Sequence, residues 1–186
     1  MKKILITLVL GLLVLAGCTT SQQEDQPTDK TEEMKEDMTS KTNEGVAAPS
    51  FVYTDLDGNE VKLSDFEGKK IYIKYWASWC PICLSGLERL DQLFEGVEEN
   101  DDYRVLTVVT PGYNNEGSAE EFKQWFSGLD YENIEVLFDM DGEYAKEFNV
   151  RAVPTSVFIG SDGVIISSLA GDKSNEDIMT TLESFN

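Results

Sequence analysis

Two cysteines stand three residues apart in the stretch Trp76-Ala77-Ser78-Trp79-Cys80-Pro81-Ile82-Cys83, which follows an apolar run, Ile71 to Tyr75. A run with helical spacing comes next, so the cysteines fall where a strand passes into a helix. Pro81 suits the first helical position, because its missing N–H would have no partner there. The free N–H groups and the positive end of the helix dipole favour a thiolate at Cys80. A thiolate attacks disulfides and Cys83 lies one turn on, so the stretch predicts a reversible dithiol/disulfide switch.

Composition narrows the possible functions. The chain has 186 residues, 35 of them acidic and 15 basic, with a formal net charge of −20. This length allows one domain with a substantial core plus extensions. Nucleic-acid binding and electrostatic adhesion to anionic lipid both need basic surface, so the charge argues against them. We interpret the excess of acid as a contribution to solubility.

The cysteine and histidine content excludes several kinds of site. The chain has three cysteines, Cys18, Cys80 and Cys83, and no histidine. The usual general base of Ser/His and Cys/His catalysis is therefore missing. A zinc site would need four ligands of these two types, and a c-type haem site would need histidine where Leu84 stands. We expect no metal and no cofactor.

Residues 1–17 are typical of a targeting segment. Two lysines precede an apolar run, 4–14, that is too short for a comfortable membrane span. The run leads to Leu15-Ala16-Gly17-Cys18, which resembles the lipobox of bacterial lipoproteins. The resemblance implies cleavage before Cys18 and lipid on its sulfur, which would anchor the protein to the membrane. An ordinary signal peptide and an uncleaved anchor are the alternatives.

Residues 18–46 are predicted to hold the lipidated cysteine and an acidic tether. They contain no aromatic residue and almost no aliphatic one, so they cannot bury enough surface to order themselves. As a flexible coil they would span roughly 30 Å. The folded domain is expected over 47–186.

Within that domain, turn signals and hydrophobic periodicity predict a hairpin followed by alternating strands and helices. The predicted strands cover 51–53, 61–63, 69–75, 103–110, 134–138, 155–159 and 164–169. The predicted helices cover 64–68, 81–97, 118–126, 143–148 and 174–185. Alternation implies parallel strand pairs with helices on both faces. We therefore expect an α/β fold with a central mixed sheet and an N-terminal β-hairpin extension.

The stretch from Lys74 to Cys83 closely resembles the active site of the thioredoxin superfamily. The domain opening, with Ala48-Pro49-Ser50-Phe51, resembles the membrane-tethered, extracytoplasmic TlpA/ResA-like branch. Val153-Pro154-Thr155 resembles that family's cis-proline loop. The match covers about 47–186 and implies a thioredoxin-like fold.

The resemblance also implies roles for single residues. Cys80 would be the attacking cysteine and Cys83 the resolving one. Pro154 would be cis and lie against the pair, so that the backbone of Val153 could pair with an extended client segment as a short added strand. A trans proline that starts an edge strand is the alternative.

Lys74 stands where thioredoxins carry a buried acid. If it points inward, its charge would stabilise the Cys80 thiolate by Coulomb attraction. We expect Lys74, with Trp79 and Pro81, to tune this thiolate, although a lysine that extends to the surface is the alternative. Trp76 and Trp79 would frame the site, and plain core packing is the alternative for Trp76.

The resemblance leads to an expected function, a lipid-anchored thiol–disulfide oxidoreductase outside the cytoplasmic membrane. It implies a membrane electron donor of the CcdA/DsbD type and client disulfides such as those of surface methionine sulfoxide reductases. Cytochrome-maturation members often carry glutamate where this chain has Gly86, which argues against that role. A disulfide-forming oxidase and a non-enzymatic surface-binding lipoprotein remain alternatives. Peroxidase activity is disfavoured, because Ala77 stands where peroxiredoxins usually carry threonine.

Overall fold

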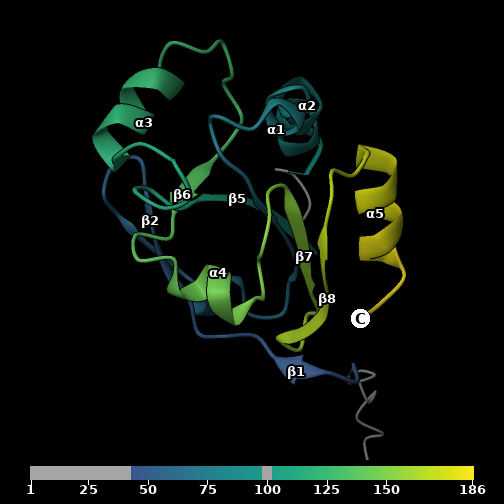
Figure 1. The fold of residues 1–186 in the computed structure, drawn as a ribbon. Helices are drawn as coiled ribbons and strands as arrows, with labels where there is room; N and C mark the ends of the chain where they lie inside the picture. The colour runs from purple at the N-terminus through teal and green to yellow at the C-terminus, as the bar shows by residue number, and fades with distance from the viewer. Residues whose placement is uncertain (1–42, 98–101) are drawn as a thin grey trace, which may run out of the picture. The chain divides into compact units, whose positions relative to one another are not determined.

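The computed structural model describes residues 43–97 and 102–186 (Figure 1). The predicted targeting segment, the Cys18 lipidation site and most of the predicted tether lie outside these residues. Across the described ranges, no helix has the length and apolar character needed to cross a membrane.

One mixed sheet forms the centre of the described domain. Its strands are β1 (Val46–Ala47), β2 (Val52–Asp55), β3 (Glu60–Lys62), β4 (Lys70–Tyr75), β5 (Tyr103–Val109), β6 (Val136–Phe138), β7 (Thr155–Ile159) and β8 (Val164–Ala170). They lie in the order β1-β8-β7-β4-β5-β6-β2-β3. β4, β5 and β6 run parallel, and the remaining pairs are antiparallel. The predicted mixed sheet is confirmed, and the hairpin β2–β3 extends it beyond β6.

Helices cover both faces of this sheet (Figure 1). They are η1 (Leu63–Phe66), α1 (Pro81–Leu84), α2 (Leu87–Val97), α3 (Ala119–Phe126), α4 (Glu143–Glu147) and α5 (Asn175–Glu183). One core joins the sheet to α1, α2, α3 and α5, and a second core joins it to α4. Side chains alternate along β4, so Tyr72 enters the first core while Ile71 and Ile73 enter the second.

The prediction of one helix over 81–97 is wrong, because the helix breaks after the cysteines. α1 ends at Leu84 and α2 begins at Leu87. Between them, the N–H of Gly86 donates to the carbonyl of Cys83 over 3.1 Å, which is three residues back instead of four. Glycine favours such a break, since it is a poor helix former.

The folded part begins before residue 47. Val46 and Ala47 form β1, which pairs with β8. Upstream of them, the N–H of Asn43 donates to Asp162 Oδ2 over 2.6 Å. A two-residue strand carries no periodic signal, so the sequence did not predict this addition.

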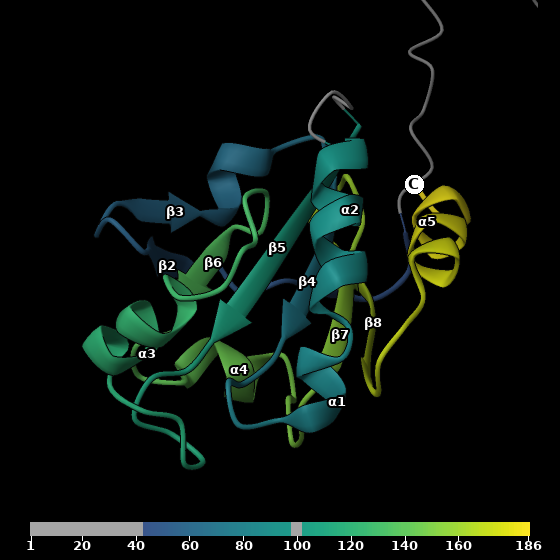
Figure 2. The same cartoon turned by 90° about the horizontal axis from the view of Figure 1, so that it is seen from above.

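Three loops meet at the end of the sheet where β4 and β5 finish and β7 begins. Figure 2 shows α1 beside the C-terminal ends of β4 and β5. Tyr75, the last residue of β4, pairs with Thr155 at the start of antiparallel β7 and with Val108 of parallel β5. The loops after β4, after β5 and before β7 therefore meet where the cysteines lie.

Candidate active site

Cys80 and Cys83 form a disulfide across the first turn of α1. Cys80 caps the helix, and its Sγ accepts the N–H of Cys83 over 3.3 Å. Pro81 occupies the first turn, as its missing N–H allows. Cys83 is fully buried and Cys80 retains 4% exposure, so the more exposed cysteine is also the N-cap residue of α1.

The loop before β7 lies against this disulfide. The peptide bond between Val153 and Pro154 is cis. The carbonyl oxygen of Val153 lies 3.8 Å from Cys80 Sγ. Pro154 is buried, whereas Val153 is half-buried and borders the groove described below. The structure thus brings the pair Cys80 and Cys83 against Val153 and Pro154, which lie about seventy residues later in the sequence.

The two tryptophans beside the cysteines differ in their surroundings. Trp79 is 46% exposed and lines the groove described below. Trp76 is 2% exposed and its ring packs against Phe122, Trp125 and Phe126. Trp76 is therefore a core residue.

Lys74 points inward, on the side of β4 that faces α1 and α2. It is 3% exposed, and its Nζ lies 2.7 Å from Asp172 Oδ1. Arg89 of α2 binds the other oxygen of the same carboxylate, also at 2.7 Å. A Cβ on Gly86 would lie 3.3 Å from Lys74 Nζ and 3.2 Å from Asp172 Oδ2. Gly86, three residues after Cys83, therefore leaves the space that this charged cluster occupies.

Sequence reasoning missed Asp172. It lies 98 residues from Lys74 along the chain, in the loop between β8 and α5. No local pattern connects the two positions.

Sequence reasoning also missed Glu116, a buried acid with 7% exposure. Its carboxylate accepts the backbone N–H of Ser78 over 2.7 Å and the Ser78 hydroxyl over 2.6 Å. The N–H of Gly117 donates to the same carboxylate over 3.1 Å. Glu116 therefore fixes the loop that carries Trp79 and Cys80 to the loop after β5.

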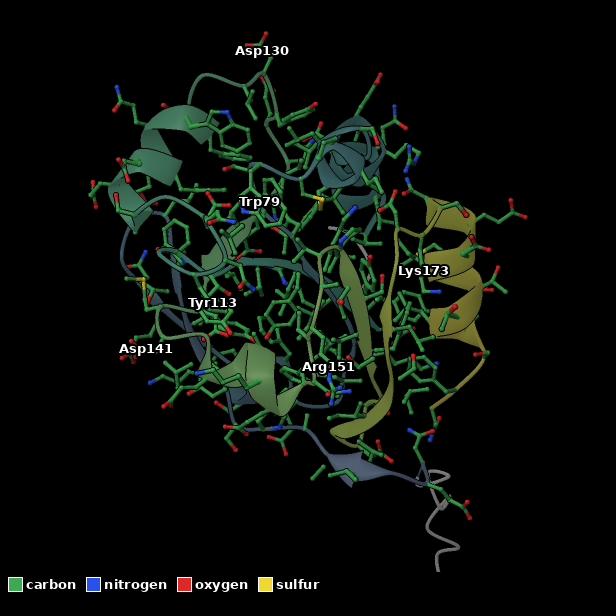
Figure 3. All side chains as sticks on the ribbon, viewed as in Figure 1. Trp79, Tyr113, Asp130, Asp141, Arg151 and Lys173 are labelled. Atoms are coloured by element: carbon green, nitrogen blue, oxygen red, sulfur yellow. A yellow bond between two sulfur atoms is a disulfide. The ribbon has the colours of Figure 1, made fainter. Side chains whose placement is uncertain are left out.

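A groove of about 390 Å³ opens beside the disulfide. Trp79, Tyr113, Arg151 and Val153 line it, together with Asn114 and its neighbours. Figure 3 shows Tyr113 and Arg151 below Trp79 in that view. The groove thus joins the loop of the cysteines to the loops after β5 and before β7.

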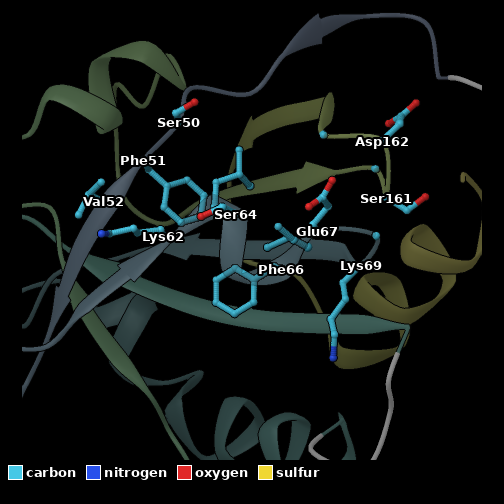
Figure 4. Close-up of a pocket in the computed structure, with 15 residues that line it drawn as sticks. Ser50, Phe51, Val52, Lys62, Ser64, Phe66, Glu67, Lys69, Ser161 and Asp162 are labelled. Atoms are coloured by element: carbon cyan, nitrogen blue, oxygen red, sulfur yellow. The ribbon is translucent and has the colours of Figure 1, made fainter.

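A second hollow, of about 510 Å³, lies at the opposite end of the sheet (Figure 4). It is lined by Ile71 at the start of β4 and by the turn 160–163 after β7. None of its lining residues neighbours the cysteines in the sequence, whereas Trp79 lines the groove described above. Within 43–97 and 102–186, no group of three or more acids and cysteines has the geometry to hold a metal ion.

A family model described as Redoxin matches residues 43–182, the stretch that contains all of this geometry. The chain belongs to the redoxin family. Its relatives include thiol–disulfide oxidoreductases, and the redoxin is itself a thioredoxin-like enzyme of this class.

Several similar proteins agree with this membership. The redoxin is 42% identical to Etrx1, an exposed lipoprotein thioredoxin from Streptococcus pneumoniae, over 74% of this chain and 100% of that one, with a TM-score of 0.69. It is 31% identical to the thiol-disulfide oxidoreductase ResA of Geobacillus kaustophilus over 145 residues, covering 75% of this chain and 76% of that protein. The N-terminal domain of PilB from Neisseria gonorrhoeae is 28% identical, with a TM-score of 0.61, over 71% and 87% of the two chains.

Proposed function

We propose that this redoxin is a lipid-anchored reductase outside the cytoplasmic membrane, which passes electrons from a membrane donor to client disulfides. The observation that carries the proposal is the Cys80–Cys83 disulfide at a helix N-terminus, with the Val153 carbonyl 3.8 Å from Cys80 Sγ. A helix N-terminus favours the thiolate that attacks, and the adjacent backbone can hold an extended client.

The reaction consists of two exchanges. The reduced enzyme's Cys80 thiolate attacks one client sulfur, and the client's other sulfur leaves as a thiolate that takes up a proton. Cys83 then loses its proton and attacks Cys80 Sγ, which releases the first client sulfur as a thiolate. The client gains two electrons, and the enzyme keeps the Cys80–Cys83 disulfide.

Four further residues have roles around these sulfurs. The Val153 backbone pairs with the client strand, and Pro154 holds the loop against the pair. Pro81 starts the helix whose N-terminus stabilises the Cys80 thiolate. Trp79, half-exposed beside Cys80, covers the client cysteine.

Lys74 tunes the Cys80 thiolate. Its inward ammonium contributes positive charge beneath the active-site helix. Asp172 forms ion pairs with both Lys74 and Arg89. The cluster of these three side chains therefore has a net positive charge.

Cys18 is the proposed lipid attachment site, after removal of residues 1–17, with 18–46 as the tether. The lipobox-like sequence supports this, as does the likeness to Etrx1, whose name describes an exposed lipoprotein. Replacement of Cys18 with Ser would move the protein from the membrane fraction to the soluble one. Retention of the variant in membranes would contradict the anchor.

The re-reducing partner is a membrane thiol donor of the CcdA/DsbD type, because no soluble donor is expected outside the cytoplasm. The proposed clients are disulfides such as those formed by surface methionine sulfoxide reductases. Similarity to the TlpA/ResA-like branch supports both. The test is single-turnover reduction of a peptide disulfide by the reduced enzyme, which Cys80→Ser would abolish. An unchanged rate would favour a surface-binding lipoprotein instead.

A further inference from the structure

Two cations near the active site, Lys146 and Arg151, are not part of the charged cluster of Lys74, Arg89 and Asp172. In the described ranges, ion pairs with acids are made by Lys62, Lys74, Arg89, Arg104 and Lys123. Arg151 and Lys146 have no acid within ion-pair distance in those same ranges. The Nε of Arg151 donates to Asn149 Oδ1 over 2.9 Å, a neutral partner within its own turn.

Both cations border the groove beside the disulfide. Arg151 lines it and stands two residues before Val153. Lys146 Nζ lies over the ring of Tyr113, 6.0 Å from its centroid, and Tyr113 is another lining residue. Arg151 and Tyr113 are exposed, so an incoming chain can reach them (Figure 3).

The acid that lines the groove does not cancel this charge at its surface. Glu116 is buried, and its carboxylate is held by Ser78 and Gly117. Charges beyond about 8 Å are largely screened at physiological salt, so the net charge of the whole chain has little effect inside the groove. Of the two charged residues that line the groove, Glu116 is buried and Arg151 is exposed.

The established exchange chemistry determines what enters the groove. A client sulfur must approach Cys80 Sγ, and the Val153 carbonyl lies 3.8 Å from that atom. Residues on one flank of the client cysteine then enter the groove, which is lined by Trp79, Tyr113 and Arg151. The site is continuous with the place where the client must bind.

We propose that this groove binds the segment flanking a client's reactive cysteine, and that Arg151, supported by Lys146, selects segments with a carboxylate side chain there. The proposal rests on the reductase function and adds the chemistry of its preferred client. A carboxylate matches the forked donors of Arg151, and the rings of Trp79 and Tyr113 cover neighbouring apolar groups. Arg151 is thus a specificity residue that contacts the client.

The test uses the full-length reduced protein and two synthetic peptides. Both peptides carry the same intramolecular disulfide, and they differ only in Glu or Gln at two positions that flank one cysteine. At low salt, the Glu peptide is expected to exchange about three- to fivefold faster, the range of one exposed ion pair. The preference falls towards unity as salt is raised, because the pair is screened.

Two variants locate the effect. Arg151→Gln is expected to abolish the preference, so that the Glu and Gln peptides exchange at equal rates. Lys62→Gln is the control, because it removes the same charge at the opposite hollow of Figure 4. Equal rates for both peptides with the unaltered protein, or a preference that survives Arg151→Gln, would overturn the docking proposal alone. Failure to exchange either peptide would overturn the reductase function, and the docking proposal with it.

Discussion

Lys74 Nζ lies 2.7 Å from Asp172 Oδ1, against the glycine that follows the active-site turn. The two side chains come from β4 and from the loop between β8 and α5. A buried lysine with a shared carboxylate partner supplies charge of both signs near the redox pair. The two charges act on a thiolate in opposite directions, which makes their roles separable.

Replacement of Lys74 with Gln removes a positive charge and is expected to raise the pKa of the Cys80 thiol. Asp172→Asn removes a negative charge and is expected to lower it. Thiolate absorbance of the reduced protein, followed across a pH titration, measures both changes. Arg89→Gln, at a more exposed position, is the control and should shift the pKa least. An unchanged titration in Lys74→Gln would rule out a tuning role.

Replacement of Cys80 and replacement of Cys83 are expected to block the exchange reaction at different steps. Cys80→Ser should reduce peptide exchange below detection, because no nucleophile remains at the accessible position. In the Cys83→Ser variant, Cys80 should still attack the client disulfide. No second thiol is then present to release the client, so a mixed disulfide between Cys80 and the client should accumulate. Mass spectrometry of the trapped adduct distinguishes the two variants. An adduct on Cys80→Ser would reverse the assigned roles.

Glu116→Ala is expected to destabilise the protein by about 1.5–3 kcal/mol, since a buried carboxylate loses hydrogen bonds and leaves donors unpaired. It should also slow exchange, because Ser78 belongs to the loop that carries Cys80. Urea unfolding gives the stability. Glu120→Ala, at an exposed position on α3, should change it by no more than about 0.5 kcal/mol. Equal effects of the two substitutions would contradict the account of Glu116.

Asp139 gives the fold a predicted pH dependence. Burial raises its pKa, the backbone N–H of Ala145 opposes the rise, and the charge of Asp141 adds to it. The folded pKa lies above the unfolded value, so the folded state binds the proton more tightly. The resulting stability is fully present below the unfolded pKa and is lost as pH rises through the folded one.

Asp139→Asn isolates this effect. Between about pH 7 and about pH 4, the free energy of unfolding of the unaltered protein is expected to rise relative to that of the variant. Urea unfolding of both proteins at the two pH values gives the difference. A difference that stays constant, or moves the other way, would show that Asp139 keeps an ordinary pKa.

The sequence predicted the parts of this site that local chemistry determines. The strand before Trp76, the capping position of Cys80 and the turn at Asp57-Gly58 each depend on neighbouring residues. The cis loop at Pro154 was expected from resemblance alone, since local chemistry favours trans.

The features of the site and fold that the sequence did not predict depend on contacts between distant segments. Asp172 and Glu116 act on the active-site region from other loops, and neither lies in a pattern that points to its partner. The apolar spacing continues across the break at Gly86, so helical periodicity predicted a continuous helix instead. Asn43 joins the domain through Asp162, far along the chain.

The reduction potential of the Cys80–Cys83 pair tests most directly whether this redoxin carries electrons to its clients. Titration in defined thiol buffers, followed by tryptophan fluorescence, gives the value, and Trp79 beside the pair supplies a reporter. A reductase should lie near the potential of thioredoxin, about −270 mV. A value near that of DsbA, about −120 mV, would mean that the enzyme forms disulfides, and would contradict the proposed direction.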